Sequence, residues 1–134
     1  MYQVLQDKFG EGNGNCFQAC LASILERPLK DCIDISYADI DDKHWISYVN
    51  DFLAPFGLFF VPVDIGKSED TTKFKGYQIL IGKSERGIQH AVVGKNGKCI
   101  HDPFPEGKGL ESISHIGIFG VFNPVTVKVE NTKE

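Results

Sequence analysis

Residues 89–102 have the sequence QHAVVGKNGKCIHD, in which two short apolar runs flank an Asn-Gly turn. Runs of this kind on either side of Asn-Gly are typical of a β-hairpin, because Asn and Gly tolerate the positive φ that tight hairpin turns require. A hairpin joins neighbouring antiparallel strands directly, without a crossover helix. This stretch therefore predicts an antiparallel sheet.

Further strands are predicted on both sides of the hairpin. After Gly57 the chain is rich in β-branched and aromatic residues, with Gly, Pro or Asn between the runs. The predicted strands are residues 58–64, 76–81, 89–94, 98–102, 116–122 and 125–130, and residues 2–5 form a short strand at the start. Residues 66–75 are predicted to be a polar loop, and the last few residues are expected to fray.

Two helices are predicted before these strands. In residues 16–27 the apolar side chains recur at helical spacing on one face. Asn15 is a good residue type for the N-cap, and Pro28 marks the far boundary. In residues 42–56 the apolar side chains also recur at helical spacing, with Gly57 suited to the C-terminal end and Pro55 expected to end the helix a turn early.

Helices followed by a run of strands indicate the α+β class rather than alternating βαβ units. The length of 134 residues suits one domain, which we take to be residues 1–134. Hydrophobic residues make up 42% of the chain and charged residues 24%, as in soluble globular domains. The net charge of −4 argues against a protein that binds nucleic acid or an anionic membrane.

The start of the chain gives an expectation about location. Residues 1–8 lack the basic and apolar regions of a signal peptide, and the longest apolar run, residues 58–63, is too short to cross a membrane. We therefore expect a cytoplasmic protein. Its four cysteines are then expected to be thiols, because cytosolic redox buffers keep them reduced.

Cys16 is the candidate nucleophile. It follows a glycine-rich loop and stands at the predicted start of a helix. The positive end of a helix dipole stabilises a thiolate, and the free N–H groups of the first turn can stabilise an oxyanion beside it. Cys20 lies one turn later on the apolar face and is interpreted as a small buried residue. An isolated cysteine would more often be structural, but the loop and the helix start favour reactivity here.

His90 is the candidate base, and Asp102 is the candidate acceptor that orients it. The hairpin turn decides whether they meet. A two-residue turn at Asn96-Gly97 places His90 opposite Pro103 and sends Asp102 to the other face, whereas a three-residue loop places His90 opposite Asp102. The sequence permits both turns. The catalytic interpretation requires the three-residue loop, and the alternative is an ordinary hairpin with a solvated histidine.

Gln6 is the candidate donor to an oxyanion, since its side-chain amide stands at the end of the first predicted strand. Other kinds of site are poorly supported. The Cys16-x3-Cys20 spacing lacks a second pair of zinc ligands, and the glycine-rich loop is not followed by the Gly-Lys-Ser/Thr of a phosphate-binding loop. We therefore expect no metal and no cofactor.

Taken together, these motifs resemble those of papain-like cysteine peptidases. The Cys16 helix and the His90 and Asp102 strands are similar to those of the bacteriocin-leader peptidases. Five blocks are also similar to those of small papain-like proteins of phages and bacteria: residues 6–10, 14–16, 84–87, 90–93 and 101–103. The resemblance extends to about Leu110. Two departures are Phe17, where leader peptidases have Gly, and a longer loop between Gln6 and Cys16.

The resemblance implies a papain-like fold, with a nucleophile helix packed on an antiparallel sheet. It implies that Cys16 is the nucleophile, His90 the base and later the acid, Asp102 the orienting residue and Gln6 the oxyanion donor. We expect a small cysteine peptidase that acts on a peptide or protein. Two alternatives stay open: a deamidase or transglutaminase-like acyl transferase acting on glutamine side chains, and a non-catalytic, phage-type binding or inhibitor protein.

Overall fold

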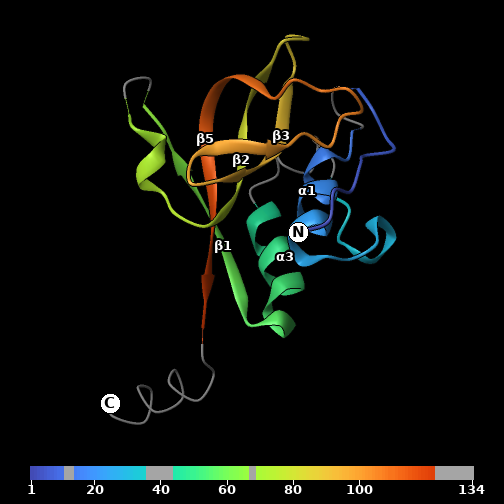
Figure 1. The fold of residues 1–134 in the computed structure, drawn as a ribbon. Helices are drawn as coiled ribbons and strands as arrows, with labels where there is room; N and C mark the ends of the chain where they lie inside the picture. Colours follow the sequence, from blue (N-terminus) through green and yellow to red (C-terminus); the bar gives the residue numbers. More distant parts are fainter. Residues whose placement is uncertain (11–13, 36–43, 67–68, 123–134) are drawn as a thin grey trace.

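The protein is described here by a computed structural model that covers residues 1–10, 14–35, 44–66 and 69–122. Its core is one five-stranded antiparallel sheet with two α-helices packed against it (Figure 1). The strands are β1 (Leu58–Asp64), β2 (Tyr77–Ser84), β3 (Gln89–Lys95), β4 (Lys98–His101) and β5 (Leu110–Val121). In the sheet their order is β1-β5-β2-β3-β4. The predicted α+β class is confirmed.

The first helix, α1, spans Cys16–Leu25 and ends at Glu26, which has a left-handed φ of 58°. The second, α3, spans Trp45–Leu53 and continues into a short 3-10 turn at Ala54–Phe56. Pro55 lies in that turn, so the predicted early end of the helix is confirmed. Gly57 follows with a φ of 73°, as its expected place at the C-terminal end requires.

The two faces of the sheet are covered differently. On one face, α1 and α3 bury a core that includes Phe17 and Leu21 from α1, Leu53 from α3, and Ile79 and Val93 from the sheet. Aromatic edges complete this core, because Phe17 meets both Trp45 and Phe60 in T-shaped contacts. The opposite face has a smaller core around Leu80, Val92 and Ile116.

Three strand predictions differ clearly from the structure: those for β5, for β2, which runs to Ser84 rather than to residue 81, and for residues 2–5. β5 begins at Leu110 rather than at residue 116, because its polar first half pairs with the far end of β2 across two irregularities. The predicted strand at residues 125–130 lies outside the described residues. The predicted strand at residues 2–5 is wrong: the N–H groups of Tyr2 and Val4 donate to Ser23 of α1 instead of to a neighbouring strand.

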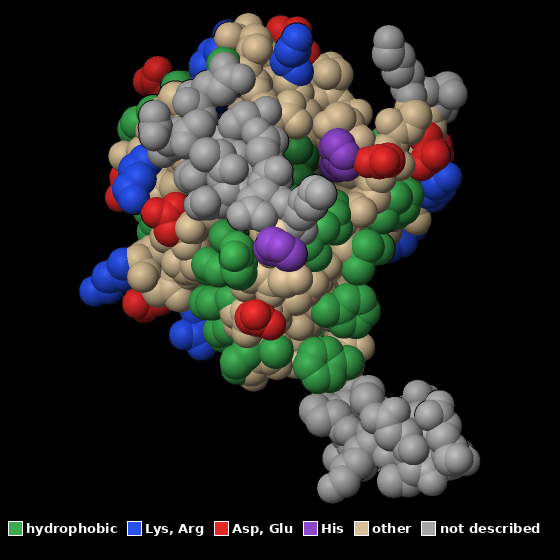
Figure 2. Space-filling model, turned by 180° about the vertical axis from the view of Figure 1, so that it is seen from behind, with side chains coloured by type: hydrophobic (Ala, Val, Ile, Leu, Met, Phe, Trp, Pro, Cys, Tyr) green, Lys and Arg blue, Asp and Glu red, His purple; other side chains and the backbone are tan. Residues whose placement is uncertain are grey.

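Hydrophobic side chains also reach the surface. Figure 2 shows them gathered on the lower part of one face, where α3 and β1 lie in Figure 1. The exposed large residues of these elements include Tyr48, Phe59 and Val61. Within the described part of the chain, no helix is long and apolar enough to cross a membrane.

Candidate functional site

Cys16 is the first residue of α1 and is half-buried. Asn15 stands at the N-cap position, as predicted, but its side chain makes no capping hydrogen bond among the described groups. Instead its Oδ1 accepts from the N–H groups of Asp7 and Lys8, and its Nδ2 donates to Asp7 and Gln18. The first N–H groups of α1 are therefore not occupied by the residue that most often caps them.

The other thiols differ from Cys16. Cys20 is fully buried, as predicted, and burial raises its pKa well above the ordinary range. Burial also raises the pKa of Cys32 to about 11. Cys99 is exposed as a residue, yet burial of its sulfur and the nearby Asp102 carboxylate raise its pKa as well. These three thiols are disfavoured as thiolates near neutral pH.

The hairpin between β3 and β4 has the two-residue turn, so the predicted three-residue loop is wrong. Asn96 and Gly97 both have positive φ, and Lys95 pairs with Lys98. The expectation that this turn would separate His90 from Asp102 is also wrong. A bulge at Ile100 shifts the pairing, so that Gly94 faces Cys99 but Val93 faces His101. One extra residue reverses the alternation of faces, which brings Asp102 to the same face as His90.

His90 and Asp102 form a buried ion pair. The His90 Nε2 lies 2.7 Å from the Asp102 Oδ1, and the two side chains are 2% and 7% exposed. Burial alone would lower the pKa of His90, but hydrogen bonds with the Asp102 carboxylate and the Cys16 sulfur outweigh it and raise the pKa to about 9. With Nε2 facing Asp102, the ring nitrogen left for the thiol is Nδ1.

The Asp102 carboxylate is held on three sides. Its Oδ1 accepts from the N–H of Phe104 as well as from His90, and its Oδ2 accepts from the N–H of Gly109. Burial opposes the charged form, but these donors outweigh it and lower the pKa of Asp102. Gly107 lies so close to the carboxylate that a Cβ there would overlap it. The carboxylate is therefore charged and fixed at neutral pH.

Phe104 packs beside this ion pair. Its ring meets the His90 ring edge-on, with 6.4 Å between centroids, and it makes a second edge contact with Phe9. The guanidinium of Arg86 stacks on the Phe104 ring at 3.6 Å from the centroid. A hydrogen bond shielded from water is stronger than an exposed one, and the burial of the His90 and Asp102 side chains shields theirs.

Gln6 lies beside the same loop. Its backbone N–H donates to the Pro103 carbonyl, and its Nε2 donates to the Lys8 carbonyl at 2.9 Å. The side chain is buried, and its Oε1 has no partner in the described part of the chain. One Nε2 hydrogen is left for another acceptor. The structure thus brings Cys16, His90 and Asp102 together, while the role of Gln6 stays a prediction.

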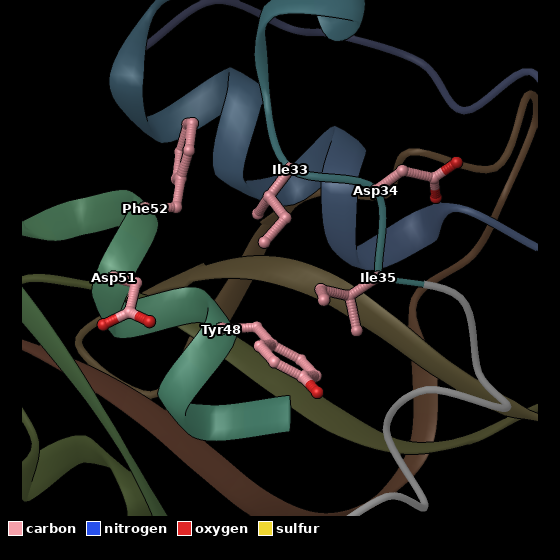
Figure 3. A pocket seen from close by; sticks show the side chains of 6 residues that line it. All are labelled: Ile33, Asp34, Ile35, Tyr48, Asp51 and Phe52. Atoms are coloured by element: carbon pink, nitrogen blue, oxygen red, sulfur yellow. The ribbon is translucent and has the colours of Figure 1, made fainter. Parts of the chain in front are cut away.

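A well-formed hollow lies away from these residues. A hollow of about 530 Å³ opens between α3 and the segment after Cys32 (Figure 3). It is lined by Ile33, Asp34, Ile35, Tyr48, Asp51 and Phe52. None of the predicted site residues lines it, so its size does not connect it with the chemistry of Cys16. A second hollow, of about 460 Å³, lies beside Asp102 and His101.

Three residues of the site were missed from the sequence: Arg86, Phe104 and Gly107. Arg86 lies in a block already noted for its resemblance, and Phe104 follows the His-Asp-Pro block directly. Their closeness in sequence to predicted site residues is the signal that could have identified them. Nothing in the sequence marks Gly107, because its close approach to Asp102 exists only in the folded chain. Among the described residues, no group of three or more His, Cys, Asp and Glu is arranged to hold a metal ion.

Comparison with known proteins adds no relative: no family model, curated protein or solved structure matches this chain. The interpretation of the site therefore rests on its own chemistry. A half-buried thiol, an imidazole that holds a proton at neutral pH and a fixed carboxylate are the parts that nucleophilic catalysis by cysteine requires.

Proposed function

We propose that this protein is a thiol-dependent hydrolase of amide bonds, a small cysteine peptidase of papain-like type that acts in the cytoplasm on a peptide or protein. The observation that carries the proposal is the buried His90–Asp102 pair beside Cys16, joined at 2.7 Å. A structural histidine has no need of a buried carboxylate partner and a thiol on its other side. The arrangement of nucleophile, base and orienting acid matches the requirements of covalent catalysis.

In the proposed first step, the Cys16 sulfur attacks the carbonyl carbon of an amide. A C–S bond forms, and the carbonyl π electrons move to oxygen. The oxyanion then collapses, the C–N bond breaks, and His90 gives its proton to the leaving amine. In the second step, His90 takes a proton from water, the hydroxide adds to the thioester, and the thiolate leaves as the carboxylic acid is released.

The oxyanion would be held by N–H groups at the start of α1. Cys16 is the first residue of α1, so its N–H belongs to the first turn and has no acceptor within the helix. The free hydrogen of the Gln6 Nε2 is the second donor in this proposal, because the other hydrogen is bonded to Lys8. Gln6→Ala would then lower kcat by roughly 10²–10³-fold with little change in KM.

The test is the reactivity of each thiol in the native protein. We expect iodoacetamide to alkylate Cys16 faster than the other three cysteines near neutral pH, measured by mass spectrometry of time-resolved digests. Cys99 is the internal control, because it is exposed and no imidazole in the described part of the chain is among the groups that shift its pKa. His90→Ala should remove the advantage of Cys16. If Cys20, Cys32 or Cys99 reacts faster than Cys16, the assignment of the nucleophile is wrong.

Turnover separates the peptidase from its alternatives. Peptides derived from a proteome digest are incubated with the wild type, with Cys16→Ser and with the matched control Cys99→Ser. Backbone cleavage that requires Cys16 but not Cys99 supports the peptidase. Loss of ammonia from glutamine side chains without backbone cleavage supports the deamidase instead. A reactive Cys16 with neither product indicates a binding protein.

A further inference from the structure

Arg86 lies at the edge of the candidate site on a well-defined turn. The Ser84 side chain and backbone both donate to the Ile88 carbonyl, and the N–H of Gly87 donates back to Ser84. This turn connects β2 to β3, and Arg86 within it lies four residues before His90 in the sequence. The position of Arg86 is therefore fixed by the same strand that holds the imidazole.

The guanidinium of Arg86 has its hydrogen-bond donors available. Its carbon stands 3.6 Å from the centre of the Phe104 ring, the shortest such contact in the described residues. A guanidinium stacked on a ring keeps its in-plane N–H groups free for a planar anion. Arg86 is exposed, and it takes part in none of the ion pairs or hydrogen bonds found among residues 1–10, 14–35, 44–66 and 69–122.

Phe104 connects this cation to the reacting groups. Its ring meets His90, and its N–H donates to the Asp102 carboxylate at 2.9 Å. His90 has Cys16 on one side and the Asp102–Phe104 loop on the other. In the proposed reaction His90 protonates the departing amine, so the groups beyond His90 face the leaving half of the substrate rather than the acyl half.

We propose that Arg86 binds a carboxylate on the leaving-group side of the scissile bond, so that the preferred substrates carry an acidic side chain or a free C-terminus close to that bond. This inference rests on the proposed function, since it takes Cys16 and His90 as the reacting groups. A planar guanidinium suits a carboxylate because it can donate two parallel hydrogen bonds. Arg86 is not among the hydrogen-bond donors to Asp102, so its charge can be removed without breaking the His90–Asp102 pair.

The first test compares two alkylating probes that differ in charge. Iodoacetate carries the carboxylate and iodoacetamide is its neutral counterpart. The ratio of their rates at Cys16 measures how well the site accepts an anion. Arg86→Gln keeps a planar side chain but removes the charge, and it should lower this ratio by roughly threefold at low ionic strength. Arg86→Lys should keep most of the ratio.

The matched control is Lys95→Gln. Lys95 is also a cation over an aromatic ring, 5.0 Å from the centre of Tyr77, but it lies at the other end of β3 from His90. Its removal changes the net charge equally and should leave the ratio unchanged. An equal ratio in the wild type and Arg86→Gln would overturn the inference. Slow reaction of Cys16 with iodoacetamide itself would instead contradict the proposed function, so the two failures are distinguishable.

The second test distinguishes the two sources of the carboxylate. Peptides from a proteome digest are supplied with free or amidated C-termini, and cleavage sites are mapped by mass spectrometry. If acidic side chains are bound, wild-type cleavage is enriched before Asp and Glu in both pools, and Arg86→Gln loses the enrichment. If the C-terminus is bound, amidation abolishes cleavage near the end of the peptide. Cleavage that is indifferent to both, in wild type and variant alike, contradicts the inference.

Discussion

Asp102 is the residue on which the candidate site most depends. It accepts hydrogen bonds from His90, Phe104 and Gly109, and its charge offsets the cost of burying a protonated imidazole. A buried histidine without a charged partner favours the neutral form. The pKa of about 9 for His90 therefore reflects the carboxylate and the thiol together, acting against burial.

Replacing the charge tests this account directly. Asp102→Asn keeps the size of the side chain but removes its charge, so the pKa of His90 should fall by roughly 1–3 pH units. The change is measured by NMR of the His90 ring protons during a pH titration. The same variant should slow turnover, because His90 would then hold its proton less well and point less reliably at Cys16.

Asp64→Asn is the matched control for Asp102→Asn. Asp64 also pairs with a histidine, at 2.6 Å from the Nε2 of His115, but its side chain is 92% exposed. Its removal should leave the His90 titration unchanged. A His90 that titrates near 6.5 in the wild type would contradict a charged imidazole in the site.

Gly107 tests how tightly the carboxylate is confined. A methyl group in Gly107→Ala would overlap the Asp102 carboxylate, which must then move away from His90. We expect a loss of about 1–3 kcal/mol in the free energy of unfolding and slower alkylation of Cys16. Gly66→Ala is the control, because a Cβ at Gly66 meets nothing within 4 Å. Equal effects of the two substitutions would show that the carboxylate has room.

At the scale of elements, the β3–β4 hairpin positions Asp102. Residues outside the hairpin also hydrogen-bond to its turn. Gln78 accepts from the N–H of Gly97, and Thr71 donates its hydroxyl to the Gly97 carbonyl. Asn96 accepts from the N–H of Gly76 through its side chain. The turn is therefore held by contacts that are remote in sequence, which local propensity does not report.

The substitution Gly97→Ala should damage this turn more than its φ alone would suggest. Gly97 has a φ of 81° and Gly76 a φ of 85°, so an alanine at either site incurs a backbone cost of roughly 1–2 kcal/mol. At Gly97 the added methyl also overlaps Thr71, whereas at Gly76 it meets nothing within 4 Å. Urea unfolding should show the Gly97 variant to be less stable than Gly76→Ala by roughly 1–3 kcal/mol. Equal losses would contradict the packing of Thr71 on the turn.

The elements show what could be predicted from the sequence. The bounds of β1 and the early end of α3 were predictable, because apolar spacing, Gly57 and Pro55 are local signals. The bulge at Ile100 was not, because a bulge has no local signature and depends on how β4 meets β3. The pairing of His90 with Asp102 was therefore predicted correctly through an incorrect turn. The use of Asn15 as a link between α1 and residues 7–8 was missed for the same reason.

At the scale of the whole molecule, two segments tie the helix layer to the sheet. The Val4 carbonyl accepts from the Nε2 of His101 on β4, while the Val4 N–H donates to Ser23 of α1. The N–H of Gln6 donates to Pro103 in the Asp102 loop. The N-terminal residues thus contact both the helix that carries Cys16 and the loop that carries Asp102. The same hydrogen bonds therefore hold the fold together and position the site.

The raised pKa of His90 makes the free energy of unfolding depend on pH. His90 keeps its proton to about pH 9 in the folded state, whereas an unfolded histidine releases it near 6.5. The stabilisation is complete below pH 6.5, where both states hold the proton, and it is lost as the pH rises to about 9. The free energy of unfolding should fall by about 3 kcal/mol across this interval. Asp102 has the opposite sign: its contribution is present above pH 3.8 and is lost in acid.

Above pH 9 the buried thiols extend the decline. An unfolded cysteine ionises near pH 9, while Cys32 stays neutral to about 11, so unfolding is increasingly favoured over that range. Urea unfolding at a series of pH values separates the two contributions. His90→Gln should flatten the profile between pH 6.5 and 9, and Cys32→Ala should make the decline between 9 and 11 less steep, with the remainder due to Cys20 and Cys99. A wild-type profile that is already flat from pH 6.5 to 9 would mean that folding leaves the pKa of His90 unchanged. That result would contradict a protonated His90 paired with the Asp102 carboxylate.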